Sequence, residues 1–174
     1  PLMPFLDWLL FKNSGKDTIT LNIGGIANIT YIPKGGNLKK VIGFDTGPGM
    51  SLIDECCSIF WDDHMDENCK HSSDGIIIPQ LLNKLMNHEY ISKKPPKSTG
   101  RKEFGRNLVK KIIIDNKLIS PEDILRTLIA FTSNSIARSI INLPNYNTKL
   151  FRIVLNGGGI YHKILIEEIF KLLG

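Results

Sequence analysis

The sequence predicts an α/β fold, in which a mixed sheet containing an antiparallel meander is flanked by helices. Strand-like segments rich in β-branched residues follow one another at 18–22, 27–32 and 40–45, and such close spacing is typical of antiparallel neighbours. A fourth short apolar segment, 151–155, comes only after long helical stretches. Strands in one run, followed by helices and a further strand, fit an α/β domain.

Glycines and polar turns separate the first three strands. Residues 1–12 mix apolar side chains with prolines and predict a loop and short helix packed on the core. Gly24 and Gly25 interrupt the strand pattern, and residues 34–37 form a turn. We therefore expect a sheet edge near the two adjacent glycines.

Apolar residues at helical spacing predict the helices. The long helix has the clearest start, because Ser120 opens a capping box with a proline at the first helical position. Asp74 is the predicted cap of another helix. The expected helical ranges are 51–60, 74–87, a segment ending near 116, 121–142 and 162–173.

The stretch GFDTGPGMSLID places one carboxylate, Asp45, between a buried strand and a glycine turn that leads into a helix. Gly47, Pro48 and Gly49 predict a tight turn whose free helix-start amides and dipole favour a phosphate. Asp54 would stand one turn into the helix, near that phosphate. A carboxylate beside a phosphate can hold magnesium through water or accept a proton. An ordinary strand-to-helix connection capped by an Asp explains the same residues.

The break in NIGGIAN lies where a ligand or another backbone could approach closely. Asn22 and Asn28 flank it with amides able to hydrogen-bond phosphate or sugar, so these two residues with Gly24 and Gly25 are candidates for a cleft. A β-bulge with two turn-friendly asparagines is an equal alternative.

A basic loop and a second glycine turn complete the candidates. Residues 97–101 follow two prolines as Lys97, Ser98, Thr99, Gly100 and Arg101, and composition alone favours a linker over a site. Strand 151–155 ends in a triple-glycine turn before the last helix, which suits a nucleotide lying against the backbone. These three glycines are Gly157, Gly158 and Gly159.

Composition excludes several classes of protein. The chain has 174 residues, 42% of them hydrophobic, and a formal charge of +5. Its lysines are scattered without a recognised nucleic-acid module, so we expect no nucleic-acid partner. No apolar run approaches membrane-spanning length, and no membrane partner is expected. Three cysteines, two of them adjacent, indicate reduced thiols in a cytoplasmic protein and no cysteine-based metal site.

Four stretches in this order make the sequence recognisable. They are LNIGGIANITYIP, GFDTGPGMSLID, PPKSTGRKEF and LNGGGIYHKIL. Together with the opening PLMPFLDWLLF, they resemble signature stretches of the anhydro-N-acetylmuramic acid kinases, within the sugar-kinase, actin and heat-shock-chaperone ATPase superfamily. The resemblance covers nearly the whole chain and implies an actin-like, ribonuclease H-like ATPase lobe.

The resemblance also implies a reaction. Such kinases use ATP and Mg²⁺ to open the 1,6-anhydro ring of anhydro-N-acetylmuramic acid and phosphorylate O6, during peptidoglycan recycling. Asp45 corresponds to the family's general base and would lie near the metal, contacting it through water. Residues 47–49 would cradle phosphates, residues 157–159 would face the adenosine, and Lys97, Ser98, Thr99 and Arg101 would close over the cleft. A homodimer is one arrangement open to such a kinase.

Departures from the family pattern keep a second reading open. Met50 and His162 replace asparagines at positions that, by the resemblance, would face a ligand. The family's YDxxG stretch is only partly kept, with Asp66 present and Cys69 in place of a small residue. The family's SGTSxDG phosphate loop does not occur. We therefore expect residues 1–174 to be one lobe, most of the C-terminal half of such a kinase, inactive alone. A catalytically silent nucleotide- or sugar-binding module is the alternative.

Overall fold

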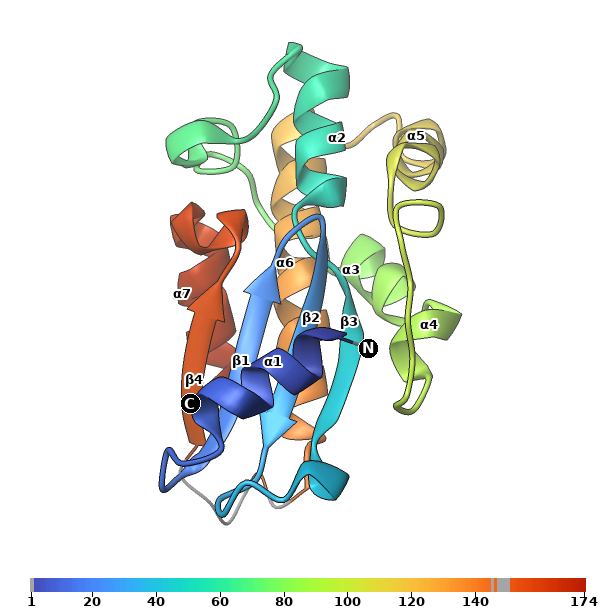
Figure 1. The fold of residues 1–174 in the computed structure, drawn as a ribbon. Helices are drawn as coiled ribbons and strands as arrows, with labels where there is room; N and C mark the ends of the chain where they lie inside the picture. Colours follow the sequence, from blue (N-terminus) through green and yellow to red (C-terminus); the bar gives the residue numbers. More distant parts are fainter. Residues whose placement is uncertain (1, 145, 147–150) are drawn as a thin grey trace.

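A four-stranded mixed sheet organises the fold (Figure 1). The computed structural model describes residues 2–144, 146 and 151–174, so Pro1 of the predicted N-terminal segment lies outside them. Three strands form the predicted antiparallel meander, and the last one joins the first in parallel. The strands are β1 (Asp17–Ile23), β2 (Ile26–Ile32), β3 (Ile42–Pro48) and β4 (Phe151–Asn156), in the spatial order β3-β2-β1-β4. The expected fold class is confirmed, and the architecture is consistent with an actin-like ATPase lobe.

Helices cover both faces of this sheet. In Figure 1, α1 crosses the front face, α6 runs behind the sheet, and α2 extends beyond the end at which β1 and β3 finish. The helices are α1 (Leu2–Phe11), α2 (Ser51–Trp61), α3 (Pro79–Met86), α4 (Glu89–Ser92), α5 (Arg106–Asp115), α6 (Pro121–Ile141) and α7 (Lys163–Leu173). Among the described residues, no helix combines the length and the apolar character needed to cross a membrane.

The two faces of the sheet differ in chemistry because strand side chains alternate. One face carries Ile19, Leu21 and Ile23, which are completely buried in the main core with residues of α6 and α7. On the other face, the hydroxyls of Thr20 and Thr30 donate to the Asp7 carboxylate of α1, at 2.8 and 2.7 Å. The second face is therefore polar even where a helix covers it.

The long helix α6 forms where the sequence predicts it. The Ser120 hydroxyl accepts a hydrogen bond from the Asp123 amide at 3.2 Å, as in a capping box. The middle of α6 is buried almost all round, and its buried residues include Thr127, Thr132, Ser133 and Ser135. The predicted helices near 51–60, up to 116 and 162–173 are also confirmed within a residue or two.

Helix α3 begins later than its apolar spacing suggests. The prediction of a helix capped by Asp74 is wrong, because residues 74–78 are irregular and α3 starts at Pro79. A residue before proline is disfavoured in helical geometry, which fits the extended backbone of Ile78. The Ile78 amide instead donates to the Thr127 hydroxyl of α6 at 3.0 Å. This tertiary contact keeps the segment before Pro79 out of helical conformation.

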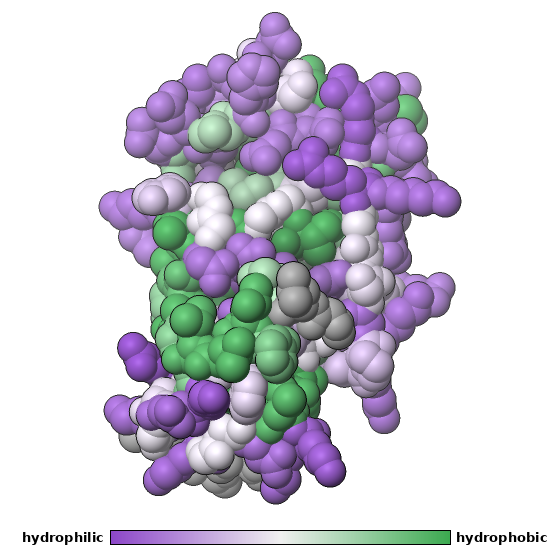
Figure 2. All heavy atoms as spheres, viewed as in Figure 1, coloured by the Kyte–Doolittle hydropathy of each residue, from purple (hydrophilic) through white to green (hydrophobic). Residues whose placement is uncertain are grey.

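An apolar patch lies on the outer side of α1. Five large side chains of this helix are between 42% and 75% exposed, namely Met3, Phe5, Leu6, Leu9 and Leu10. Figure 2 shows hydrophobic surface gathered where α1 crosses the sheet. A homodimer stays a prediction, since the structure contains one chain.

Candidate active site

One register position across the sheet carries polar side chains on every strand. Asn22 of β1 pairs with both Asn28 of β2 and Asn156 of β4, and Asn28 pairs with Asp45 of β3. Directly paired residues point to the same face of a sheet, and all four are half-buried. We call Asn156, Asn22, Asn28 and Asp45 the polar row. It brings three predicted site residues together at the sheet end where the glycine turns lie.

The basic loop is docked on Asp45. One carboxylate oxygen of Asp45 accepts the Ser98 hydroxyl at 2.8 Å and the Thr99 amide at 2.9 Å. The Asp45 amide donates to the Lys97 carbonyl at 3.2 Å, and the Asp45 carbonyl accepts the Tyr90 hydroxyl at 2.8 Å. The loop that connects α4 to α5 therefore packs on β3 and orients the Asp45 carboxylate.

Lysine and arginine of the loop point to different places. The Lys97 ammonium turns away from Asp45, donating to the Tyr90 and Ile91 carbonyls at 3.2 and 3.4 Å. The Arg101 guanidinium lies beside the backbone of Gly25, since a Cβ built there would be 3.1 Å from it. Of these two residues, only Arg101 brings its charge to the β1–β2 turn. If the loop closes over the cleft as predicted, Arg101 is therefore the residue whose charge would face it.

The turn after Asp45 is packed against the β1–β2 turn. The amides of Gly49 and Ser51 donate to the Gly25 carbonyl, and the Met50 amide donates to the Gly24 carbonyl, at 2.8–3.0 Å. A Cβ at Gly49 would lie 2.2 Å from the Gly24 carbonyl oxygen. The missing side chain of Gly49 therefore allows the two turns to touch.

These contacts correct part of the sequence reasoning. The amides at positions 49–51 are used inside the protein, so they are not the free phosphate donors expected at the start of α2. Pro48 pairs within the sheet and does not open the helix. Residues 47–49 are all buried, so phosphate binding by them stays a prediction.

The triple-glycine turn packs on the end of β1. Gly157 has a left-handed φ of +88°, and a Cβ there would lie 2.6 Å from the Asn22 side-chain oxygen. A Cβ at Gly159 would lie 2.3 Å from the Ile23 side chain, whereas Gly158 has open space. Two of the three glycines are thus required by close packing beside the polar row, and Gly158 alone faces outward.

Asp54 adds a second carboxylate to this region. It lies in the first turn of α2 and is half-buried. Burial raises the pKa of Asp54 to about 6, although the charges of Arg101 and His162 oppose this shift. A carboxyl group that titrates near neutral pH in a ligand cleft is suited to proton transfer or to binding a cation.

Met50 and His162, which replace asparagines of the family pattern, both make packing contacts within the fold. Met50 is half-buried against the hydrophobic core. His162 is buried at 5% exposure, and its Nε2 lies 3.2 Å from an Asp66 oxygen. Both substitutions therefore act within the packing of the fold.

A buried Asp66–Cys69–His162 cluster is a feature that sequence reasoning missed. Its potential ligand atoms lie within 4.8 Å of one another, although His162 lies 93 residues or more from its partners in sequence. The Nδ1 atom of His162 accepts the Leu165 amide at 3.3 Å, and Asp66 accepts the Ser72 hydroxyl. Because hydrogen bonds already occupy these atoms, we interpret the cluster as a structural network that joins residues 66–72 to α7.

Cys69 has a left-handed φ of +58°. That conformation explains in physical terms why a small residue such as glycine suits this position. Two further residues were not predicted from the sequence. Asn156 extends the polar row, which only the strand register reveals. Tyr90 contacts Asp45 of the row, which only the tertiary fold reveals.

The polar groups near the row fit a sugar, a phosphate and a cation. Asn amides donate and accept hydrogen bonds, as sugar hydroxyls and phosphates require. Asp45 and Asp54 are the carboxylates of this region that could approach a hard cation, directly or through water. These side chains therefore offer hydrogen-bonding and cation-binding groups at this end of the sheet.

Comparisons with known proteins show the family to which this chain is related. The family model for anhydro-N-acetylmuramic acid kinase matches residues 1–174. The anhydro-N-acetylmuramic acid kinase of Francisella tularensis subsp. novicida (strain U112) is 42% identical over 173 residues, which cover 99% of this chain and 45% of that protein. The enzyme of the same name from Bacillus cereus (strain G9842) is 36% identical over 169 residues, covering 97% of this chain and 44% of that protein. The chain spans less than half the length of these relatives, and it belongs to the anhydro-N-acetylmuramic acid kinase family.

Proposed function

We propose that this chain contributes the catalytic carboxylate of a kinase that opens 1,6-anhydro-N-acetylmuramic acid and phosphorylates it with ATP. The observation that carries the proposal is the polar row, in which Asp45 is oriented by Ser98 and Thr99 beside two strand asparagines. Family membership supplies the substrate class. The products would be N-acetylmuramic acid 6-phosphate and ADP.

Asp45 is the proposed general base. Its carboxylate would take a proton from the water that attacks the anomeric carbon, while the bond from that carbon to O6 breaks. The freed O6 would then accept the γ-phosphoryl group, and ADP would leave. The Ser98 and Thr99 donors hold one carboxylate oxygen, so the second oxygen is the one we assign to the proton transfer.

Magnesium and ATP are part of the proposal. Mg²⁺ binds few protein carboxylates and keeps several waters, which fits Asp45 as a ligand through water and Asp54 as a nearby charge. When bound, the ion would neutralise charge on the transferred phosphoryl group. Asn22 and Asn28 are proposed to bind sugar or phosphate oxygens, with Gly158 facing the nucleotide.

We also propose that this region works as one lobe of a larger active site. It spans 45% of the Francisella relative, and groups outside these 174 residues would complete the binding of ATP and sugar. In this proposal residues 97–101 link the edge of the sheet to the cleft between the lobes.

The experiment compares wild type with Asp45→Asn in the full-length protein. Incubation with ATP, Mg²⁺ and the anhydro-sugar in ¹⁸O-labelled water should give a 6-phosphate sugar carrying ¹⁸O at the anomeric carbon, measured by mass spectrometry. Asp45→Asn should reduce turnover by roughly 10²- to 10⁴-fold. Asp115→Asn is a matched control, because Asp115 is a surface residue of α5 that pairs with Lys84.

Two results would contradict the proposal. Turnover that survives in Asp45→Asn would remove the residue from proton transfer. Phosphorylated product without the label would contradict attack of water at the anomeric carbon, and sugar binding without any phosphorylation by the wild type would favour a silent binding module.

A further inference from the structure

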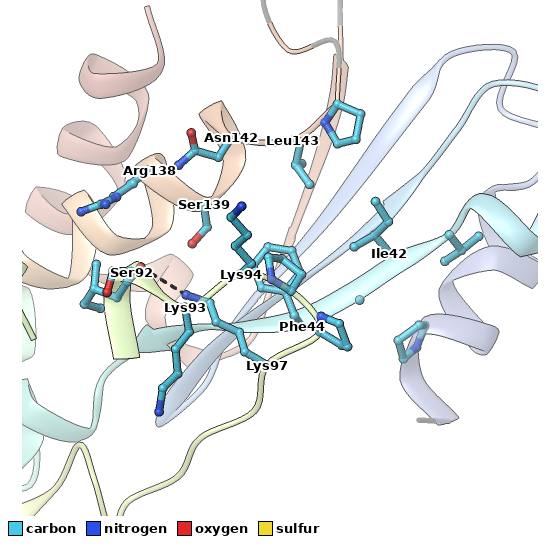
Figure 3. Close-up of a pocket in the computed structure, with 17 residues that line it drawn as sticks. Ile42, Phe44, Ser92, Lys93, Lys94, Lys97, Arg138, Ser139, Asn142 and Leu143 are labelled. Atoms are coloured by element: carbon cyan, nitrogen blue, oxygen red, sulfur yellow. Dashed lines mark hydrogen bonds between the residues drawn. The ribbon is translucent and has the colours of Figure 1, made fainter. Parts of the chain in front are cut away.

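A large cavity opens beside the polar row, below the point where the basic loop contacts β3. Its volume is about 920 Å³, within the range of small-molecule sites. Its walls come from β3, from residues 91–97 and from residues 138–144 at and after the end of α6 (Figure 3). Its described lining residues include none of the polar row, although Lys97, a candidate site residue, lies on its wall.

The floor of the cavity is apolar. Phe44, Ile91 and Leu143 are buried side chains beneath it, and Ile42 is half-buried at its side. Prolines 95, 96 and 144 add further apolar surface. An apolar body of small-molecule size could replace water over these residues at a gain of about 25 cal/mol for each Å² it covers.

The rim of the cavity carries only positive charge. Lys93, Lys94, Lys97 and Arg138 line it, and no acidic residue is among its lining residues in the described part of the chain. Lys93 pairs with Glu89 at 3.1 Å, whereas Lys94 and Arg138 form no ion pair with any residue in the described part of the chain. Figure 3 shows Lys94 and Arg138 on separate walls. This charge pattern excludes cations and favours one anionic group.

Lys97 connects the cavity to Asp45. Its ammonium lies on the cavity wall and is held by the Tyr90 and Ile91 carbonyls. Burial, reinforced by the charges of Arg138 and Lys93, lowers the pKa of Lys97. Its own carbonyl accepts the Asp45 amide, and the next two residues bind the Asp45 carboxylate. An anion that attracts the Lys97 ammonium would therefore pull on the segment that orients Asp45.

We propose that this cavity binds a small amphipathic anion, a molecule with an apolar body and one carboxylate or phosphate group. The apolar body would rest on Phe44 and Leu143, and the anionic group would pair with Lys94, Lys97 and Arg138. Occupancy would shift the 97–99 segment and so adjust the position of Asp45. The site is thus a regulatory one, distinct from the sugar and nucleotide sites.

The test uses full-length protein and decanoate as the probe, titrated by calorimetry below its micelle concentration. Decanoate should bind saturably with one site per chain, and decanol should bind at least tenfold more weakly. Decyl phosphate and inorganic phosphate form two further arms. Tighter binding of decyl phosphate would identify a phosphate ligand, and tighter binding of decanoate a carboxylate. Inorganic phosphate should bind far more weakly than either, because it lacks the apolar body.

The double variant Lys94→Glu/Arg138→Glu should weaken decanoate binding at least tenfold. Lys110→Glu reverses one positive charge on an exposed face of α5 and should leave the affinity within twofold. Urea unfolding checks that the double variant is folded. Ser92→Trp, which fills the cavity from its exposed rim, should abolish binding without altering the charges.

A spectroscopic readout tests the connection to Asp45. Decanoate should shift the amide resonances of Gly43 and Thr99 in wild type and not in Ser92→Trp. Absence of saturable binding by decanoate and decyl phosphate would overturn the proposal. Equal binding of decanol, or equal weakening by Lys110→Glu, would also overturn it. None of these measurements requires kinase activity, so the proposal can fail while the proposed function stands.

Discussion

Gly49→Ala is expected to be among the most damaging small changes in this chain. The added Cβ would lie 2.2 Å from the Gly24 carbonyl oxygen and 3.1 Å from the Ala27 amide nitrogen. Both are backbone atoms, one in the β1–β2 turn and one at the start of β2, so neither can rotate away as a side chain would. The carbonyls of Gly24 and Gly25 accept three amides from residues 49–51, and separating the two turns would break these bonds.

The size of the effect follows from those three hydrogen bonds. At about 1 kcal/mol for each net bond, Gly49→Ala should lower the free energy of unfolding by about 3 kcal/mol. Urea unfolding followed by circular dichroism should show a midpoint lower by about 1–2 M. Gly100→Ala is the matched control, because a Cβ there meets nothing within 4 Å. A Gly49→Ala protein within 1 kcal/mol of wild type would refute the reasoning.

Three further predictions concern the surroundings of the site. Burial raises the folded-state pKa of Asp54 to about 6, so the free energy of unfolding should fall as pH rises from about 4 to 6. Asp54→Asn should abolish that fall and raise the free energy of unfolding by about 1 kcal/mol at pH 8, after allowance for solvent screening. An unchanged pH profile in this variant would contradict the prediction. Burial opposes ionisation of Asp66, but hydrogen bonds outweigh it and lower its pKa, so its stabilisation should be present above about pH 4 and lost as pH falls further. Asp66→Asn should lower the free energy of unfolding by about 2 kcal/mol at pH 7. In a series of thermal unfolding measurements, the melting temperature of this variant should fall less below pH 4 than that of wild type. An equal fall in both would argue against a stabilising role for the Asp66 carboxylate. Gly159→Ala should lower stability by about 2 kcal/mol through contact with Ile23, while Gly158→Ala should stay within about 0.5 kcal/mol in the same urea assay; equal effects of the two would show that the turn can relax.

Much of the fold could be predicted from local patterns. The capping box at Ser120, the apolar spacing of α6 and the glycine breaks between strands are properties of short segments, and the structure confirms them. The start of α3 could not be predicted this way, because the amide of Ile78 bonds to Thr127 from a helix far along the chain. Local propensity decides where an element can form, and tertiary contacts decide where it stops.

The candidate site divides in the same way. The fold class, the family, the carboxylate at Asp45 and the glycine turns can all be read from residue types in a fixed local order. Three features depend on the folded chain: Asn156 joins the polar row, the loop with Ser98 holds Asp45, and His162 is buried on Asp66. Strand register and long-range hydrogen bonds join residues far apart in the chain, and no local pattern encodes which of them will meet.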